Sequence, residues 1–194
     1  MMRRGTEDDP SARERILAAA GELFAESGFD ATPTSRIAAL ARVPKGLVHY
    51  YFRKKQDLLT ALVARLPDQH IEPDAVVVPG DVAGSLRRLV AELDARNRAS
   101  TLLSHLLWRE ADTHPSVEEA LRARFSTVVE QVRAVIHGAS AAPLVATRVE
   151  TAARLLALAV SYRHSVARHD DPGDDSTIDH EVDFIAGALT APAR

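Results

Sequence analysis

The sequence predicts an all-α fold of about nine helices. Apolar residues recur at the i, i+3, i+4, i+7 spacing of a helix through most of the chain. No convincing two-residue alternation of a strand occurs, apart from the short run at residues 76–78. Hydrophobic residues make up 46% of the 194 residues and charged residues 26%, which is ordinary for a globular protein.

The first helix is predicted to follow a charged arm at residues 1–10 and to run from about Ser11 to Gly28. Its apolar residues form one stripe, and glycine is the residue that most readily ends a helix. A second helix is predicted over about 33–41. Thr32 is a good N-cap for it, and the proline that follows suits the first helical position.

A helix-turn-helix is predicted over about residues 33–52, with its second helix at about 45–51. Val48 and Phe52 lie four residues apart and can anchor one face of that helix in the core. Another face carries lysine, histidine and tyrosine side chains, and is therefore rich in hydrogen-bond donors. Gly46 costs about 1 kcal/mol relative to alanine in a helix. This cost makes sense if a phosphate or sugar must come close.

The remainder of the chain is also predicted to be helical. Residues 67–80 contain three prolines and are predicted to be a linker. Ser116 and Glu119 fit a capping box, and Gly138 fits the position just after a helix end. The predicted helices, beyond the first three, lie at about 55–66, 82–97, 101–112, 116–137, 143–168 and 175–189.

The charge distribution indicates a polyanion as the partner of the N-terminal part. The chain has a net charge of −3, but residues 1–66 carry 11 Lys/Arg against 8 Asp/Glu and the rest 13 against 19. Six basic residues and no acidic residue lie between Arg36 and Lys55. A local stripe of one sign is typical of a nucleic-acid-binding surface. The absence of cysteine excludes a disulfide scaffold, a thiolate zinc site and a cysteine nucleophile.

Residues 13–63 resemble the N-terminal domain of the tetracycline-repressor (TetR) family in the order and spacing of several short motifs. The motifs are Arg15-Ile16-Leu17, Leu23-Phe24, Gly28-Phe29 with Thr32, Ile37-Ala38, the run from Lys45 to Phe52, and Lys55 with Leu58-Leu59. The resemblance covers about a third of the chain. The other two-thirds matches the family only as an all-helical domain of the right length.

The resemblance implies a sequence-specific transcriptional regulator rather than an enzyme. Such a protein is a two-fold homodimer whose paired recognition helices enter successive major grooves of a palindromic double-stranded DNA operator. Repression that is released by a small-molecule effector is the commoner mode in the family. The implied domains are an arm (1–10), a DNA-binding domain with a linking helix (11–66) and an effector-binding and dimerisation domain (67–194). No cofactor, metal or membrane association is expected, and the expected location is the cytoplasm.

The resemblance also assigns residues to the DNA-binding site. Thr32 and Lys55 fall where the family contacts phosphates from helix N-termini. Tyr51 is either a buried ring or a phosphate-bonding hydroxyl. The residues that fall where groove or backbone contacts are usual are Ser35, Lys45, Gly46, Leu47, His49 and Tyr50.

Two residues near the turn depart from the family pattern. Arg42 stands where the family usually has glycine, so either it adopts a left-handed conformation at a cost of about 1–2 kcal/mol or the turn is slightly reshaped. The arginine could regain something through a phosphate contact. Pro44 stands where Ser or Thr is frequent, and loss of a side-chain cap costs about 0.5–2 kcal/mol. The turn is therefore the part of the motif where the geometry is expected to differ most from the family pattern.

The C-terminal part offers only a weak prediction of an effector pocket. A pocket needs apolar walls with a few polar groups, and the residues that fit best are His105, Trp108, Arg109, Phe125 and Tyr162. A simple core role for Trp108 is at least as good an interpretation. By resemblance the two last long helices pair with their copies in a four-helix dimer bundle, although a monomeric bundle is an alternative. The histidines at 164, 169 and 180 lack the i, i+4 spacing of a helical metal site.

Two alternatives come from other functional classes. An all-helical enzyme would need a nucleophile–base pair or a metal constellation, and no such motif is recognisable. A helical adaptor would use the basic stripe to bind an acidic protein. The dependence of binding on salt separates the adaptor from a DNA-binding protein.

Overall fold

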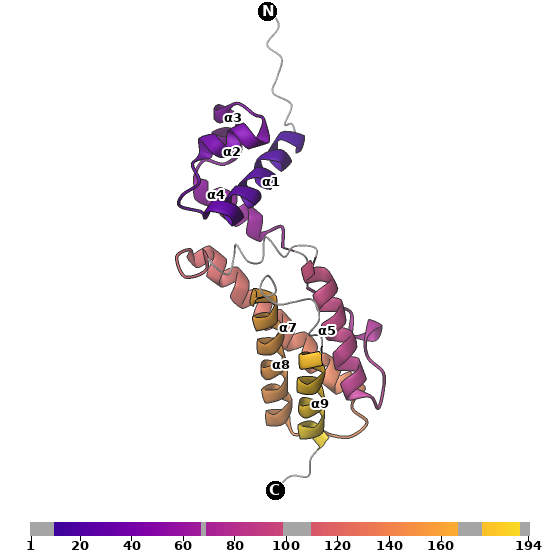
Figure 1. The fold of residues 1–194 in the computed structure, drawn as a ribbon. Helices are drawn as coiled ribbons and strands as arrows, with labels where there is room; N and C mark the ends of the chain where they lie inside the picture. The colour runs from indigo at the N-terminus through magenta and orange to yellow at the C-terminus, as the bar shows by residue number, and fades with distance from the viewer. Residues whose placement is uncertain (1–9, 67–68, 99–109, 167–175, 191–194) are drawn as a thin grey trace, which may run out of the picture. The chain divides into compact units, whose positions relative to one another are not determined.

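The structure, a computed structural model, describes residues 10–66, 69–98, 110–166 and 176–190 of the chain, and each regular element in these residues is a helix (Figure 1). The all-α prediction is therefore confirmed. None of the helices in this part of the chain is long and apolar enough to cross a membrane.

The described residues form two compact units. The first contains residues 10–66 and also 110–118, which come much later in the sequence. The second contains the rest, and the boundary between the units falls inside a single helix, α7 (Pro115–Ala139), after Glu118.

The first unit is built on α1 (Pro10–Ser27), against which α2 (Thr34–Ala41), α3 (Lys45–Tyr51) and α4 (Lys55–Val63) pack. Helix α1 ends as predicted, because Gly28 adopts a left-handed φ of 88° while its N–H donates to the Phe24 carbonyl at 2.8 Å. The largest fully buried side chains of the unit are Ile16, Leu17, Phe24, Ile37, Leu58 and Leu59.

The start of α2 differs from the prediction. The helix begins at Thr34 with Pro33 as its N-cap residue, and no side chain caps it. The Thr32 hydroxyl instead donates toward two carbonyls near the end of α1, that of Leu23 at 3.2 Å and that of Gly28 at 2.8 Å. The prediction that Thr32 caps α2 is thus wrong. Its hydroxyl instead binds the carbonyl of Leu23, within the last turns of α1, and that of Gly28, just after the helix.

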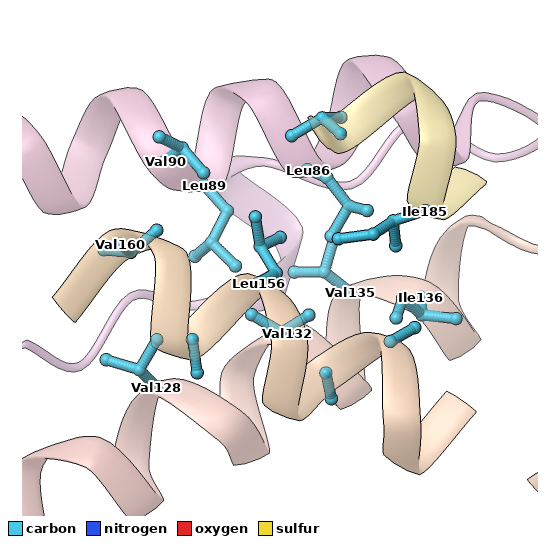
Figure 2. Packing of buried hydrophobic residues seen from close by; sticks show 14 of the residues in the cluster. Leu86, Leu89, Val90, Val128, Val132, Val135, Ile136, Leu156, Val160 and Ile185 are labelled. Carbon is cyan, nitrogen blue, oxygen red and sulfur yellow. The ribbon is translucent and has the colours of Figure 1, made fainter. Parts of the chain in front are cut away.

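The second unit consists of α5 (Val82–Arg98), most of α7, α8 (Ala146–Val166) and α9 (Ser176–Thr190), together with the short 3₁₀ helix η1 (Pro73–Ala75). Its core is almost entirely aliphatic, and Figure 2 shows side chains from the four long helices converging on it. The labelled residues are Leu86, Leu89 and Val90 from α5, Val128, Val132, Val135 and Ile136 from α7, Leu156 and Val160 from α8, and Ile185 from α9.

The segment predicted as a linker contributes to this core. Ile71 and Val76 are buried in it, so the described part of 67–80 is a packed segment rather than a free connection. The predicted role of Gly138 is also wrong, because α7 continues through it to Ala139. A Cβ at Gly138 would lie 3.2 Å from a Val77 methyl group, so the glycine allows this segment to pack closely on the helix.

The ends of the other C-terminal helices agree with the prediction to within a few residues. Helix α7 begins at Pro115, so Ser116 lies inside the first turn and is not the N-cap of a capping box. Most of the helix predicted at 101–112 lies outside the described residues, as do His105, Trp108 and Arg109.

Candidate nucleic-acid interface

The recognition helix predicted from the sequence is α3, and its bounds of Lys45–Tyr51 are those predicted. One side is fixed in the core by Val48, which is fully buried, and by Phe52 at the helix C-cap. The Arg13 guanidinium lies 5.5 Å from the centre of the Phe52 ring and covers this anchor from α1. The anchor leaves the opposite side of α3 free to face a partner.

The side chains on that opposite side are exposed. Lys45 and His49 are exposed, and Tyr50 retains 60% of its accessible surface. The Tyr50 ring packs edge-on against Tyr51, with ring centroids 5.1 Å apart, and Tyr51 is half-buried. Tyr50 is thus exposed to a partner, while one edge contact of its ring is made by a partly buried neighbour.

The turn before α3 contains a left-handed residue at Arg42, where glycine is usual in the family. Arg42 adopts φ 56° and ψ 47°, and it is the only non-glycine residue with positive φ in the described part of the chain. Its N–H bonds to the Ala38 and Ala39 carbonyls, and the Val43 N–H donates to Ala38 at 3.0 Å. This is a helix C-terminal motif in which glycine is usual. Of the two alternatives left open by the sequence, Arg42 takes the left-handed conformation, and the turn is not reshaped to avoid it.

The beginning of α3 also follows the prediction. Pro44 is the N-cap residue and provides no side-chain hydrogen bond, and its carbonyl accepts from the Leu47 N–H at 2.9 Å. A Cβ built on Gly46 would meet nothing within 4 Å in the described chain. Packing inside the protein therefore does not require glycine at this position. Ser35 on α2 is exposed and Leu47 on α3 is half-buried.

Lys55 begins α4, and its ammonium group is held in a defined place. Its Nζ donates to the Asp30 carbonyl at 3.2 Å and lies 4.4 Å from the centre of the Phe29 ring and 5.9 Å from that of Phe24. An ammonium over an aromatic face is attracted by the ring quadrupole. The side chain that the resemblance assigns to a phosphate is thus oriented before any DNA binds.

Thr32 does not belong to the open surface, although the resemblance placed it there. It is fully buried, its hydroxyl is used as described above, and its N–H donates to the Phe29 carbonyl at 3.2 Å. A direct phosphate contact would require the hydroxyl or the N–H of Thr32 to give up these hydrogen bonds. Thr32 supports the turn that carries Phe29 and Asp30.

The basic stripe is mostly exposed. Arg42, Lys45, Arg53 and Lys54 are all exposed, whereas Arg36 is paired with Glu26 at 3.2 Å. This pairing reduces the local positive charge at the start of α2. Exposed positive charges close to one another raise the local concentration of a polyanion and favour its binding.

Two buried polar residues of the first unit were missed by the sequence analysis. Glu110 and His114 are each 8% exposed and contact the segment after α1 and the first turn of α4. They come more than 50 residues after the elements they contact, and a carboxylate and an imidazole four residues apart are common on helix surfaces. Nothing in the local sequence pattern could have identified them.

The predicted effector-pocket residues that the structure describes lie in different surroundings. Phe125 is half-buried and packs against the core of the second unit. Tyr162 is 69% exposed and shares one side of α8 with Leu155 and Leu158, which are about half exposed. Tyr162 is therefore part of an exposed apolar surface rather than of the core. Phe184, which is 75% exposed, lies on α9, which packs beside α8.

The second unit also contains a buried ionic cluster. Asp94 on α5 accepts a hydrogen bond from His164 Nε2 at 2.8 Å and another from Arg163, both on α8. Burial alone would raise the pKa of Asp94, but the hydrogen bonds from His164 and Arg163 and their charges outweigh it and hold the pKa below its usual value. His164 is thus an ion-pair partner of α5. In the described part of the chain, no three His, Cys, Asp or Glu side chains are placed to hold a metal ion.

Comparison with known proteins relates the N-terminal part of the chain to one family. Residues 16–62 match the family model described as bacterial regulatory proteins, tetR family. The HTH-type transcriptional regulator TtgR of Pseudomonas putida is 31% identical over 117 residues, which are 54% of each chain. The HTH-type transcriptional repressor BepR of Brucella suis is 33% identical over 72 residues, 36% of this chain and 34% of that protein. The matches thus span about half, or less, of the length of these curated relatives.

The fold of the whole chain is also similar to solved structures. The multidrug binding protein EbrR, complexed with imidazole, superposes with a TM-score of 0.59 over 100% of both chains at 23% sequence identity. The segment that matches the family model contains α2, α3 and most of α4, which carry the open surface described above. Both curated relatives are named as regulators or repressors of transcription. Residues 16–62, which contain the recognition helix, therefore carry the pattern of the tetR family of bacterial regulatory proteins.

Proposed function

We propose that this protein is a sequence-specific DNA-binding regulator that reads an operator with the exposed side of α3. The observation that carries the proposal is a short helix fixed by Val48 while Lys45, His49 and Tyr50 point outward. The hydroxyl, imidazole and ammonium groups can donate to base edges or phosphates in a major groove. The open space beside Gly46 lets a backbone or sugar come close. Ser35, Leu47, Arg42 and Lys55 would complete the contact surface.

A homodimer is the form in which two such helices would reach a palindromic operator in the cytoplasm. The surface that supports dimerisation is the α8/α9 apolar face, formed by Leu155, Leu158, Tyr162 and Phe184. The three α8 residues follow helical spacing, and exposed apolar surface of this kind typically marks a contact with another protein. A four-helix bundle of α8 and α9 with their copies would bury it.

We further propose that a small molecule binds the C-terminal domain (67–194) and releases the protein from DNA, so that the protein acts as a repressor. Two similar proteins support this: BepR is a transcriptional repressor and EbrR is a multidrug binding protein. Ligand and operator affinities would then be reciprocally coupled. DNA binding itself would lie in residues 11–66, to which Glu110 and His114, from later in the sequence, add contacts.

Footprinting on the DNA that flanks the protein's own gene, followed by fluorescence titration of the protected duplex, tests this function. Lys45→Ala and Tyr50→Ala are expected to abolish specific binding while the melting temperature stays within about 1–2 °C of the wild-type value, because both side chains are exposed. Arg88→Ala, which removes an exposed positive charge from α5, is the matched control and should bind as the wild type does.

Two results would contradict the proposal. Specific binding that survives both α3 substitutions would show that α3 is not the reading helix. An affinity for the protected duplex that does not fall with log[salt] would favour the adaptor, because each neutralised phosphate contributes about 0.9 to the slope. Repeating the titration with candidate metabolites then tests the effector.

A further inference from the structure

The residues of the first unit that follow Leu66 in the sequence lie next to the proposed phosphate anchor. Glu110 to Thr113 form a turn that is closed by the His114 N–H, which donates to the Glu110 carbonyl at 3.0 Å. The side chains of Glu110 and His114, at the two ends of this turn, point into the first unit and are almost fully buried. Buried polar groups of this kind are costly unless they are hydrogen-bonded, so their partners define what they do.

The Glu110 carboxylate uses both of its oxygens. Oε1 accepts a hydrogen bond from the Phe29 N–H at 3.3 Å, and Oε2 lies 3.6 Å from His114 Nε2. Phe29 follows the left-handed Gly28, so its N–H is not part of a helix and has no other backbone acceptor in the bonds described here. The carboxylate thus fixes the backbone at Phe29 from outside the helices α1 to α4.

His114 continues this arrangement toward α4. Its Nδ1 lies 3.3 Å from the Gln56 amide nitrogen, and its Nε2 faces the Glu110 carboxylate. The imidazole also packs edge-on against the Phe29 ring, with the ring centroids 4.5 Å apart. One side chain therefore contacts both Phe29, in the segment after α1, and the first turn of α4.

The Phe29 ring links these contacts to Lys55. The ring packs against Phe24 at 5.1 Å and against His114, and its face carries the Lys55 ammonium at 4.4 Å. Asp30, the next residue in the chain, supplies the carbonyl to which Lys55 donates. A shift of the Phe29 backbone would therefore move both groups that hold the ammonium in place.

We propose that Glu110 and His114 are positioning residues for DNA binding, which hold Phe29 and Asp30 so that Lys55 meets a phosphate of the operator. The proposal rests on the function proposed above, because it assigns a role at the same DNA-binding surface. An apolar pair could fill the same volume at comparable stability. A carboxylate and an imidazole differ from an apolar pair because their hydrogen bonds hold one backbone amide and one side-chain amide in a defined orientation.

A double-mutant cycle on the protected operator duplex tests the proposal. Lys55→Met is expected to lower the salt slope by about one and to weaken binding about tenfold, as loss of one phosphate contact does. Glu110→Leu is expected to change both quantities in the same direction. In the Lys55→Met background, however, Glu110→Leu should have no further effect, because it acts through the lysine. Glu110→Gln should bind like the wild type, because its amide oxygen can still accept from Phe29.

The charge change supplies an internal control. Glu110→Leu removes a negative charge, which by itself would strengthen binding to DNA, so a weaker complex cannot be a general electrostatic effect. Asp112→Asn removes an exposed negative charge from the same turn and should leave the salt slope unchanged. If Glu110→Leu fails to fold, Phe29→Leu replaces it: this variant keeps an apolar side chain but removes the ring face under Lys55.

The outcomes separate this proposal from the function on which it rests. A wild-type protein without salt-dependent binding to the duplex would contradict the function itself. If the wild type binds and Lys55→Met lowers the slope, but Glu110→Leu or Phe29→Leu leaves the slope unchanged, the positioning role is wrong. Losses that multiply in the double variant would also overturn it, since they would show that Glu110 acts independently of Lys55.

Discussion

Replacing Arg42 by glycine should stabilise the protein while it weakens DNA binding. Arg42 is held at φ 56° and ψ 47°, the left-handed region in which a side chain with a Cβ is strained. It is also an exposed positive charge next to the recognition helix. The two properties predict opposite effects of the same substitution, on stability and on affinity.

The expected gain in stability is small but measurable. A left-handed non-glycine residue costs about 1–2 kcal/mol. Glycine relieves this strain, but its greater conformational freedom in the unfolded chain lowers the stability by about 0.4–1 kcal/mol. The free energy of unfolding of Arg42→Gly should therefore exceed that of Arg42→Ala by about 0.5–1 kcal/mol. For a chain of this length, such a difference raises the melting temperature by about 1–4 °C.

Comparison of Arg42→Gly with Arg42→Ala isolates the backbone, because both variants lack the guanidinium. Thermal and urea unfolding measure stability, and titration of the protected duplex at several salt concentrations measures binding. Both variants should lose the same affinity, with a salt slope lower by about 0.9 if Arg42 contacts one phosphate. An alanine variant as stable as the glycine variant would refute the strain, and an unchanged slope in both would refute the phosphate contact.

Three further predictions follow from residues described above. Thr32→Val should lower the free energy of unfolding by about 1–3 kcal/mol without changing the salt slope of DNA binding, because its hydroxyl is buried and bonded to two carbonyls; Thr32→Ser, which keeps the hydroxyl, should recover most of the loss. Leu155→Glu with Phe184→Glu should shift the protein from dimer to monomer in analytical ultracentrifugation, whereas Val78→Glu, another exposed apolar position, should not. Asp94→Asn should lower stability at pH 7 by about 1–3 kcal/mol. Because the pKa of Asp94 is lowered by folding, its contribution is present above its unfolded pKa of about 4 and is lost as the pH falls through the lower folded value, so thermal melts of wild type and variant should converge as the pH falls below about 4.

The helices of the first unit could be predicted because their signals are local. The bounds of α3 follow from Pro44 before it and from the spacing of Val48 and Phe52, and α1 ends at the glycine that ends it in the sequence pattern. The sequence left open whether Arg42 is left-handed or the turn is reshaped, and the structure has the left-handed residue. Each of these features is decided by neighbouring residues in the chain.

The contacts that the sequence did not reveal are between residues far apart in the chain. Threonine is a residue type that often caps helices, but the Thr32 hydroxyl forms its hydrogen bonds with carbonyls near the end of α1. Glycine is common just after a helix end, but Gly138 lies within a helix, where it allows Val77 to pack closely. Glu110 acquires its role only when the chain brings it to Phe29. Tertiary packing decides among such partners, and periodicity carries no information about it.

The position of Glu110 in the chain has a consequence for synthesis. The ribosome finishes α1 to α4 well before it reaches residues 110–114, which complete the contacts around Phe29. At a rate of about 5–20 residues per second, the delay is roughly two to ten seconds. We expect the nascent N-terminal segment to hold Lys55 loosely during this time. A half-made chain would therefore compete poorly for the operator with the finished protein.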